Sequence, residues 1–328
     1  MTTVETPPAA TRDALGPTLI GLAKEGLDIV VVDADLGKST TARKFKDEYP
    51  DRFFGVGIAE ANMIGVSCGL AAAGKIAFCS TFAVFLPSRC YDQIRVSVAQ
   101  TGMNVKMVAS HAGISVGPDG ISAQAIEDLA LMCSLPGINV ICPADVVETR
   151  QAITVAAKTN GPFYIRTGRA KVPVIYGDDY VFELGKAHQL RDGSDATVIA
   201  VGLMVSPAIE AAQTLANEGV DCRVLNMATV SPLDEAAITA AARETGAIVT
   251  AEEHLLRTGL SAMVSQVVGR TVPVPMGAVG LDGYAESGTP EELLEKYGLT
   301  ADSIVEEVKS AVARKRAGAP TARLDGTS

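Results

Sequence analysis

The chain has 328 residues, of which 48% are hydrophobic and 20% are charged, so it can form a sizeable core and is not expected to be disordered. Its length corresponds to about two domains of ~150 residues each. The formal net charge of −10 argues against a nucleic-acid or membrane partner, because both require a basic surface. It leaves room for a small anionic substrate, which a few arginine or histidine side chains can bind.

Short apolar runs alternate with helical patterns along the first half of the chain. Strands are expected at 28–33, 53–58, 76–80, 105–110, 140–142 and 163–166. Helices are expected at 60–73, 84–100 and 123–134, and from 144 onward. Continuous apolar strands between helices predict a parallel sheet that is covered on both faces.

A segment rich in proline, glycine and aspartate, residues 169–183, interrupts this alternation. Strands are then expected at 196–201, 222–226, 247–251 and 272–279, with helices from 206, from 233, and at 259–269, 290–296 and 300–314. The fold class is therefore two tandem α/β domains with mainly parallel sheets. The expected boundaries are a first domain at 12–176, a linker at 177–188, a second domain at 189–316 and a loose tail at 317–328.

The six cysteines form no CxxC pair, and several lie inside apolar runs, which is typical of buried, reduced thiols in a cytoplasmic protein. No secretory signal is visible in residues 2–11. The apolar run from Met63 to Leu86 is interrupted by Gly74 and Lys75, so it indicates a helix, a turn and a strand rather than a membrane span.

The segment GVGIAEANMIGVSCGLAAAG places Glu60 where an apolar strand gives way to a helix of small residues. Glu60 is either a helix N-terminal carboxylate favoured by the helix dipole or a functional acid, and the residues alone leave both open. Gly65 and Gly69 lie one turn apart and suggest close approach of another element, which could be another subunit.

Two further segments are candidates for binding. In STFAVFLPSRCYDQIR, Phe82 and Phe85 are either a core pair or rings that stack on a flat heterocycle. In SHAGISVGPDGISAQ, His111 stands in a glycine-rich loop after a strand, where parallel sheets bind ligands. Metal ligation by His111 is not expected, because no second histidine or cysteine follows at ligand spacing.

These segments, together with PFYIRTGR, resemble in the same order the C-terminal half of transketolase, in the short form found in split bacterial enzymes. The resemblance runs from about Asp28 to Thr300. It implies a pyrimidine-binding domain of a thiamine-diphosphate enzyme, followed by a transketolase C-terminal domain.

The resemblance also implies roles for individual residues. Glu60 matches the glutamate that hydrogen-bonds the aminopyrimidine of thiamine diphosphate, and the implied catalytic residues are Glu60 and His111. The implied cofactor-binding residues are Asp35, Ile58, Glu60, Phe82 and Phe85. The implied substrate-binding residues are Ser39, His111, Asp119 and Arg166, with Asp119 at a donor hydroxyl and the others at a terminal phosphate. Ser88 and Ala123 stand where the family often has a tyrosine and a second histidine, which puts the usual xylulose-phosphate donor in question.

The chain lacks a GDG motif with an asparagine about 30 residues later, the pattern by which the family holds diphosphate through magnesium. The resemblance therefore implies magnesium ligands on a partner N-terminal subunit, none on this chain, and an α2β2 heterotetramer. The expected activity is transfer of a two-carbon ketol unit from a ketose phosphate, or a related anionic ketose, to an aldose. The alternatives are a beta subunit of a 2-oxoacid dehydrogenase's decarboxylating component, a 1-deoxyxylulose-5-phosphate synthase-like enzyme, and a non-catalytic module with the same fold.

Overall fold

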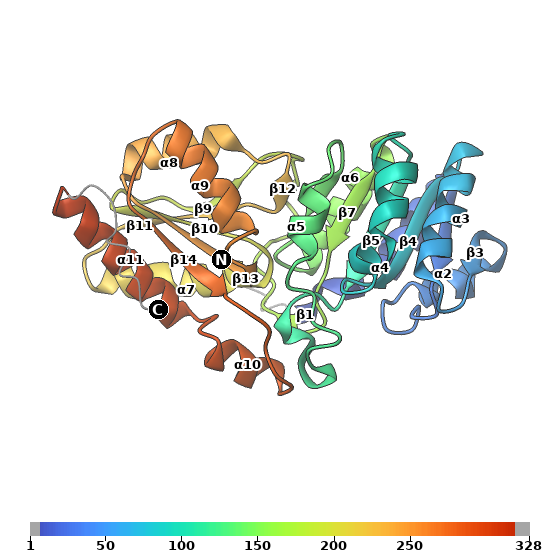
Figure 1. Ribbon diagram of the computed structural model, residues 1–328, viewed down its shortest axis with the longest axis horizontal. Helices are drawn as coiled ribbons and strands as arrows, with labels where there is room; N and C mark the ends of the chain where they lie inside the picture. Colours follow the sequence, from blue (N-terminus) through green and yellow to red (C-terminus); the bar gives the residue numbers. More distant parts are fainter. Residues whose placement is uncertain (1–6, 319–328) are drawn as a thin grey trace.

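A computed structural model describes residues 7–318, and it divides into two α/β domains that lie side by side (Figure 1). The first domain is built on a seven-stranded sheet with the order β12-β6-β7-β5-β4-β2-β3. Six of its strands are mutually parallel: β2 (Ile29–Asp33), β3 (Phe53–Gly55), β4 (Ile76–Phe82), β5 (Val105–Ser110), β6 (Asn139–Ile141) and β7 (Phe163–Arg166). The seventh, β12 (Thr229–Ser231), pairs antiparallel with β6 and comes from the second half of the chain.

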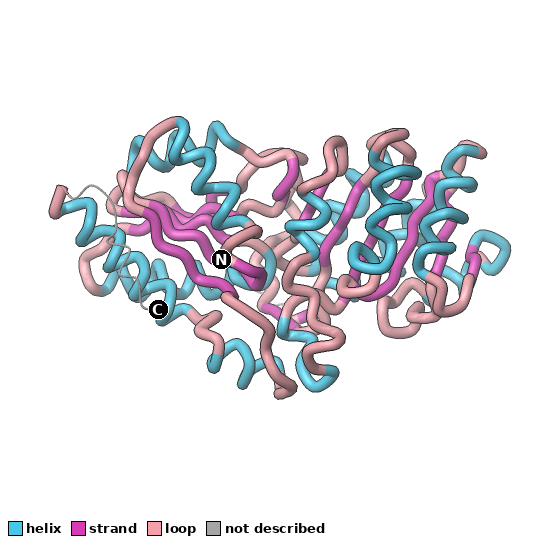
Figure 2. Tube along the Cα trace, viewed as in Figure 1, coloured by secondary structure: helices cyan, strands magenta, loops and turns pink. Residues whose placement is uncertain are grey.

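Helices cover both faces of this sheet (Figure 2). One face carries α1 (Leu15–Lys24), α2 (Arg43–Glu48) and α6 (Val146–Lys158); the other carries α3 (Glu60–Ala72), α4 (Leu86–Gln93) and α5 (Asp128–Cys133). Strand β2 shows the consequence: Ile29 and Val31 pack on the first helical layer, whereas Val30 and Val32 pack on the second. A strand buried on both sides needs apolar residues at every position, which explains its continuous apolar run.

The second domain has a five-stranded sheet with the order β14-β13-β10-β11-β9. Its strands are β9 (His188–Arg191), which is antiparallel to its neighbour, and the parallel β10 (Ala196–Ala200), β11 (Cys222–Asn226), β13 (Ile248–Leu255) and β14 (Met276–Leu281). Helices α7 (Val205–Asn217) and α11 (Ala301–Arg316) pack on one face, and α8 (Glu235–Thr245) and α9 (Leu260–Arg270) on the other. Helix α10 (Pro290–Lys296) lies against a loop of the first domain.

Short elements complete the chain. Strands β1 (Ala9–Ala10) and β8 (Lys171–Val172) form a two-stranded antiparallel ladder. The 3₁₀ helices are η1 (Thr11–Ala14), η2 (Pro50–Arg52), η4 (Ile114–Asp119) and η5 (Gly202–Met204), and α4 continues into a π-helix, η3 (Ile94–Ala99).

The predicted fold class is confirmed, while several element boundaries differ. The strand expected at 53–58 ends at Gly55, and the one expected at 272–279 starts at Met276. The helix expected from residue 123 begins only at Asp128, because the preceding residues bond to other segments, as when Leu255 N donates to Ile126 O. Strand β13 runs to Leu255 rather than ending at 251.

The segment expected to be a linker is ordered and partly buried. Tyr176 and Tyr180 stack at 3.8 Å between ring centroids, and the Tyr180 hydroxyl donates to Glu148 of α6 at 2.6 Å. The predicted boundaries stay predictions, although β12 shows that the first sheet takes a strand from beyond the linker. The predicted tail lies outside the described residues, apart from 317 and 318.

All six cysteines are free thiols, and burial raises the pKa of each one. Between residues 7 and 318, no helix has both the length and the apolar character that crossing a bilayer requires.

Candidate active-site face

The carboxyl ends of the parallel strands lie along one edge of the first sheet. The register pairs Asp33 of β2 with Gly55 of β3, and Phe82 of β4 with Ser110 of β5, so β2 ends level with β3, and β4 ends level with β5 two residues further on. The loops that follow them therefore converge, as they do at ligand sites of open α/β sheets. Every predicted site residue except Phe82 and Arg166, which end their strands, lies in a segment that follows one of these strands.

Glu60 begins α3 and is only 6% exposed. Arg89 of α4 donates from Nη1 to Glu60 Oε1 at 2.6 Å, while its guanidinium carbon lies 4.0 Å from the centre of the Phe85 ring. A flat, hydrogen-bond-donating group thus rests against an aromatic face and a carboxylate together. Because the Arg89 side chain is 49% exposed, it can leave this position without breaking the core.

The Phe82 ring lies between Phe85, which contacts Arg89, and a second group of side chains around His111. Its ring lies 5.8 Å from that of Phe85, nearly parallel at 15°, and it stacks on His111 at 3.8 Å between centroids. The rings of Phe85, Phe82 and His111 therefore form one continuous stack along the site, so Phe82 and Phe85 are not a pair of core side chains that face away from it.

His111 is held as a neutral imidazole. Its Nε2 lies 2.9 Å from Arg12 Nη1, and its Nδ1 lies 2.8 Å from Ser110 Oγ. Arginine can only donate, so Nε2 is the acceptor and Nδ1 carries the proton. Burial, aided by the charges of Arg12 and Arg169, lowers the His111 pKa to about 3. At neutral pH this histidine orients Arg12 and does not carry a charge.

Two arginines that the sequence reading did not select complete this second group. Arg12 also donates to the Ser39 carbonyl at 3.0 Å. Arg169 donates to the Val116 carbonyl at 3.0 Å and to Asp119 Oδ1 at 3.4 Å. The β1–β8 ladder, which pairs Ala10 with Lys171, brings the two arginines together. We call Arg12, Ser39, His111, Asp119 and Arg169 the arginine cluster.

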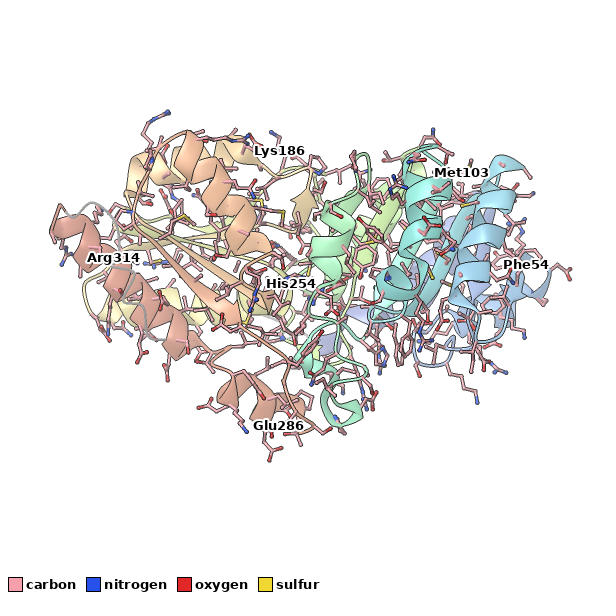
Figure 3. All side chains as sticks on the ribbon, in the orientation of Figure 1. Phe54, Met103, Lys186, His254, Glu286 and Arg314 are labelled. Carbon is pink, nitrogen blue, oxygen red and sulfur yellow. The ribbon has the colours of Figure 1, made fainter. Side chains whose placement is uncertain are left out.

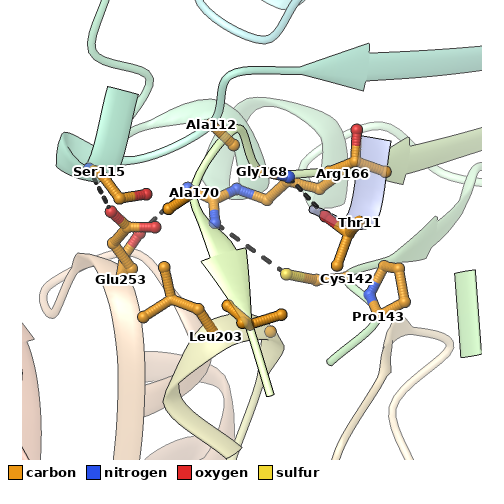
Figure 4. A pocket seen from close by; sticks show the side chains of 13 residues that line it. Thr11, Ala112, Ser115, Cys142, Pro143, Arg166, Gly168, Ala170, Leu203 and Glu253 are labelled. Carbon is orange, nitrogen blue, oxygen red and sulfur yellow. Dashed lines mark hydrogen bonds between the residues drawn. The ribbon is translucent and has the colours of Figure 1, made fainter. Parts of the chain in front are cut away.

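Arg166, predicted to bind a substrate phosphate, does not belong to the arginine cluster. It is 5% exposed, and its Nε donates to both carboxylate oxygens of Asp128, at 2.8 and 3.1 Å. Its Nη2 donates to the carbonyls of Ala125 and Glu253, both at 3.0 Å. Figure 4 shows it at a cavity of about 20 Å³ between the domains. These contacts keep its guanidinium inside the molecule, whereas Arg169, the second arginine of the motif PFYIRTGR, lies beyond the strand end.

The remaining predicted residues lie on the same face. Asp35 is exposed, with a positive φ of 66°, and with Ser39 it lines a hollow of about 480 Å³. The charged lining of this hollow is mixed, with Lys38, Arg43 and Lys46 beside Asp33 and Asp35. Ile58 is 76% exposed between β3 and α3. Within residues 7–318, no three His, Cys, Asp or Glu side chains are grouped so that they could hold a metal ion.

Residues 7–174 match the family described as transketolase, pyrimidine binding domain, and residues 185–304 match transketolase, C-terminal domain. The chain belongs to the transketolase family. It is 41% identical over 305 residues to the 6-deoxy-6-sulfo-D-fructose transketolase subunit SqwH of Clostridium sp. (strain MSTE9), covering 93% of this chain and 95% of that protein. It is 38% identical over 297 residues to an apulose-4-phosphate transketolase subunit of Phocaeicola vulgatus, covering 90% of this chain and 95% of that protein.

A solved structure described as a split gene transketolase, inactive beta4 tetramer, is 45% identical to this chain with a TM-score of 0.87, and the match covers 94% of this chain and 100% of that one. The prediction of a C-terminal subunit of a split, thiamine-diphosphate-dependent transketolase is therefore confirmed. None of these matches favours a 2-oxoacid dehydrogenase subunit, a 1-deoxyxylulose-5-phosphate synthase-like enzyme or a non-catalytic module.

Replacing Arg166 with alanine should lower the free energy of unfolding by about 3–5 kcal/mol, because it leaves the Asp128 carboxylate buried without its counterion. Urea denaturation of the purified chain measures this change. Arg169→Ala is the control, since its ion pair with Asp119 is exposed and contributes about 0–1 kcal/mol. Equal stability of the two variants would contradict an internal role for Arg166.

Proposed function

We propose that this chain supplies the aminopyrimidine-binding part of a ketol-transferring active site, together with an anion subsite for the ketose. The observation that carries the proposal is the arrangement of Glu60 and Phe85 around the planar guanidinium of Arg89. A site that already fits a flat donor between a carboxylate and an aromatic face also fits an aminopyrimidine ring.

In this arrangement Glu60 would share a proton with a ring nitrogen of the cofactor, and Phe85, flanked by Phe82, would stack on the face of the ring. The bound cofactor supplies an electron sink for breaking and making carbon–carbon bonds. Arg89 must swing away from Glu60 for the ring to enter. Asp35 and Ile58, which lie on the same open face, are proposed to border the cofactor.

We assign the magnesium ion and the cofactor's diphosphate to the partner N-terminal subunit. The partner is proposed to pack on the outer side of α3, where Gly65 and Gly69 are exposed and a Cβ on either would meet no atom within 4 Å. Close backbone approach is possible at such positions, which supports an interface there. The proposed assembly is an α2β2 heterotetramer in the cytoplasm.

For the substrate we propose an anionic ketose whose charged end binds Arg12 and Arg169, in place of the Arg166 predicted from the sequence. Two arginines near one imidazole give a local positive charge in a chain of net charge −10. The donors named for the two relatives above carry a sulfo group and a phosphate group. Asp119 is proposed to contact a donor hydroxyl, while Ala123 is buried and offers no polar group for one.

Replacing Glu60 with glutamine should lower turnover by roughly 10²- to 10⁴-fold, since glutamine has nearly the same shape but cannot exchange the proton. The variant is to be assembled with the N-terminal subunit and saturated with thiamine diphosphate and magnesium. Circular dichroism and co-elution with the partner serve as controls for folding and assembly. Near-normal turnover would show that Glu60 is only a helix-end carboxylate.

Replacing Arg169 with alanine should raise the KM for an anionic ketose by roughly 10- to 100-fold, because a charge-assisted hydrogen bond is worth ~1.5–3 kcal/mol. An uncharged ketose of the same length should be little affected. Arg150→Ala is the matched control: Arg150 is also half exposed and paired with one aspartate, Asp178, but lies outside the arginine cluster. An equal loss for both donors would argue against the anion subsite.

The chain alone should bind thiamine diphosphate weakly and show no ketol transfer, because it has no diphosphate–magnesium half. Calorimetric titration of the cofactor and a coupled assay, each with and without the N-terminal subunit, measure this. Light scattering of the mixture should give the mass of two copies of each chain. Full turnover by the single chain would rule out the split arrangement.

A further inference from the structure

The loop of residues 111–119, which carries His111 and Asp119 of the arginine cluster, rests on the second domain. Glu253 of β13 is 4% exposed, and its Oε1 accepts a hydrogen bond from the Ser115 backbone N–H at 2.6 Å (Figure 4). This carboxylate holds the main chain of the loop, on which α10 of the second domain also packs.

Gly113 shows how closely the loop fits this carboxyl group. It has a positive φ of 77°, and a Cβ placed on it would lie 2.0 Å from the Glu253 Cδ atom. Only glycine allows the backbone to turn and pass the carboxyl at this distance. The loop after His111 is therefore shaped around a side chain of the other domain.

The Glu253 contact continues into the arginine cluster. Val116, directly after Ser115, accepts the hydrogen bond from Arg169 Nη1, and Asp119 pairs with the same nitrogen. The other side of the contact is also fixed, because Arg166 Nη2 donates to the Glu253 carbonyl. A shift of Ser115 must therefore move the atoms that hold Arg169.

Further bonds from the second domain follow the same stretch of chain. Gln124 donates to the Glu286 carbonyl at 2.9 Å and accepts from Ala285 N, and His254 Nε2 lies 3.4 Å from Ala130 N. Figure 3 labels His254 and Glu286 along this contact between the domains.

Glu252 provides an internal comparison. It is as buried as Glu253, and burial raises the pKa of both carboxyl groups to about 7. Its oxygens, however, accept from the backbone N–H groups of Leu260 and Ser261, which begin α9 in the same domain. These two adjacent carboxyl groups on β13 therefore bind different segments. Glu252 binds α9 of its own domain, and Glu253 binds the loop of the first domain.

We propose that Glu253 is a positioning residue through which the second domain sets the geometry of the anion subsite. The kinetic part of this inference rests on the anion subsite proposed above for Arg12 and Arg169. Glu253 does not touch the substrate; it fixes the loop backbone that holds Arg169. A change at Glu253 should therefore alter the KM for charged donors and leave kcat unchanged.

The test compares three variants of the enzyme assembled with its N-terminal subunit, thiamine diphosphate and magnesium. Glu253→Asp keeps the charge but withdraws the carboxylate by one methylene, Glu253→Gln keeps an acceptor for Ser115, and Glu252→Asp is the matched control. We expect Glu253→Asp to raise the KM for an anionic ketose by roughly 5- to 10-fold, with kcat and the KM for an uncharged ketose unchanged. Glu253→Gln should stay near the wild type, and Glu252→Asp should leave the ratio of the two KM values unchanged.

Hydrogen exchange on the isolated chain gives a readout that does not depend on activity. Backbone amide exchange in residues 111–119 should become faster in Glu253→Asp but not in Glu252→Asp. Exchange at the start of α9 should become faster in Glu252→Asp but not in Glu253→Asp. An unchanged loop, or the same KM pattern in both aspartate variants, would overturn the proposal. Faster loop exchange with unchanged KM values would also overturn it, whereas failure of the anion subsite itself would appear separately, in Arg169→Ala.

Discussion

Arg166 is buried in an ion pair with Asp128 of its own domain and at the same time bonds to the second domain. Arg166 ends a strand of the first sheet and reaches a carboxylate on α5 as well as a main-chain carbonyl on β13. A guanidinium out of contact with water requires such partners, because an unpaired buried charge is strongly destabilising. The bond to the Glu253 carbonyl therefore ties β13, and the carboxyl groups it carries, to the end of β7.

Residue patterns predicted the fold class well, because continuous apolar runs and small-residue helices leave few alternatives to parallel sheets covered on both faces. The sequence also predicted that Glu60, Phe85 and His111 follow strands, and in the structure they lie in the segments after β3, β4 and β5. It failed where a contact depends on distant segments. Arg12 reaches His111 only through the pairing of two very short strands, β1 and β8, and no periodicity indicates which short segments will pair.

Strand position already distinguishes Arg166 from Arg169 in the sequence. Arg166 is the last residue of the apolar run of β7, where a side chain is expected to be buried, whereas Arg169 lies beyond the carboxyl end of that strand. The length of β13 could not have been predicted in this way. Glu252, Glu253 and His254 end an apolar run, yet they are buried because backbone N–H groups of other segments donate to them.

Strand β12 has a consequence for how this chain can be divided. It lies beyond the expected linker in sequence, but it forms the edge of the first sheet by pairing with β6. Cutting the chain at 177–188 would remove that strand and expose the main-chain N–H and C=O groups of β6, a template for pairing with other chains. The two domains are thus a poor choice for separate expression, although the chain looks like two modules.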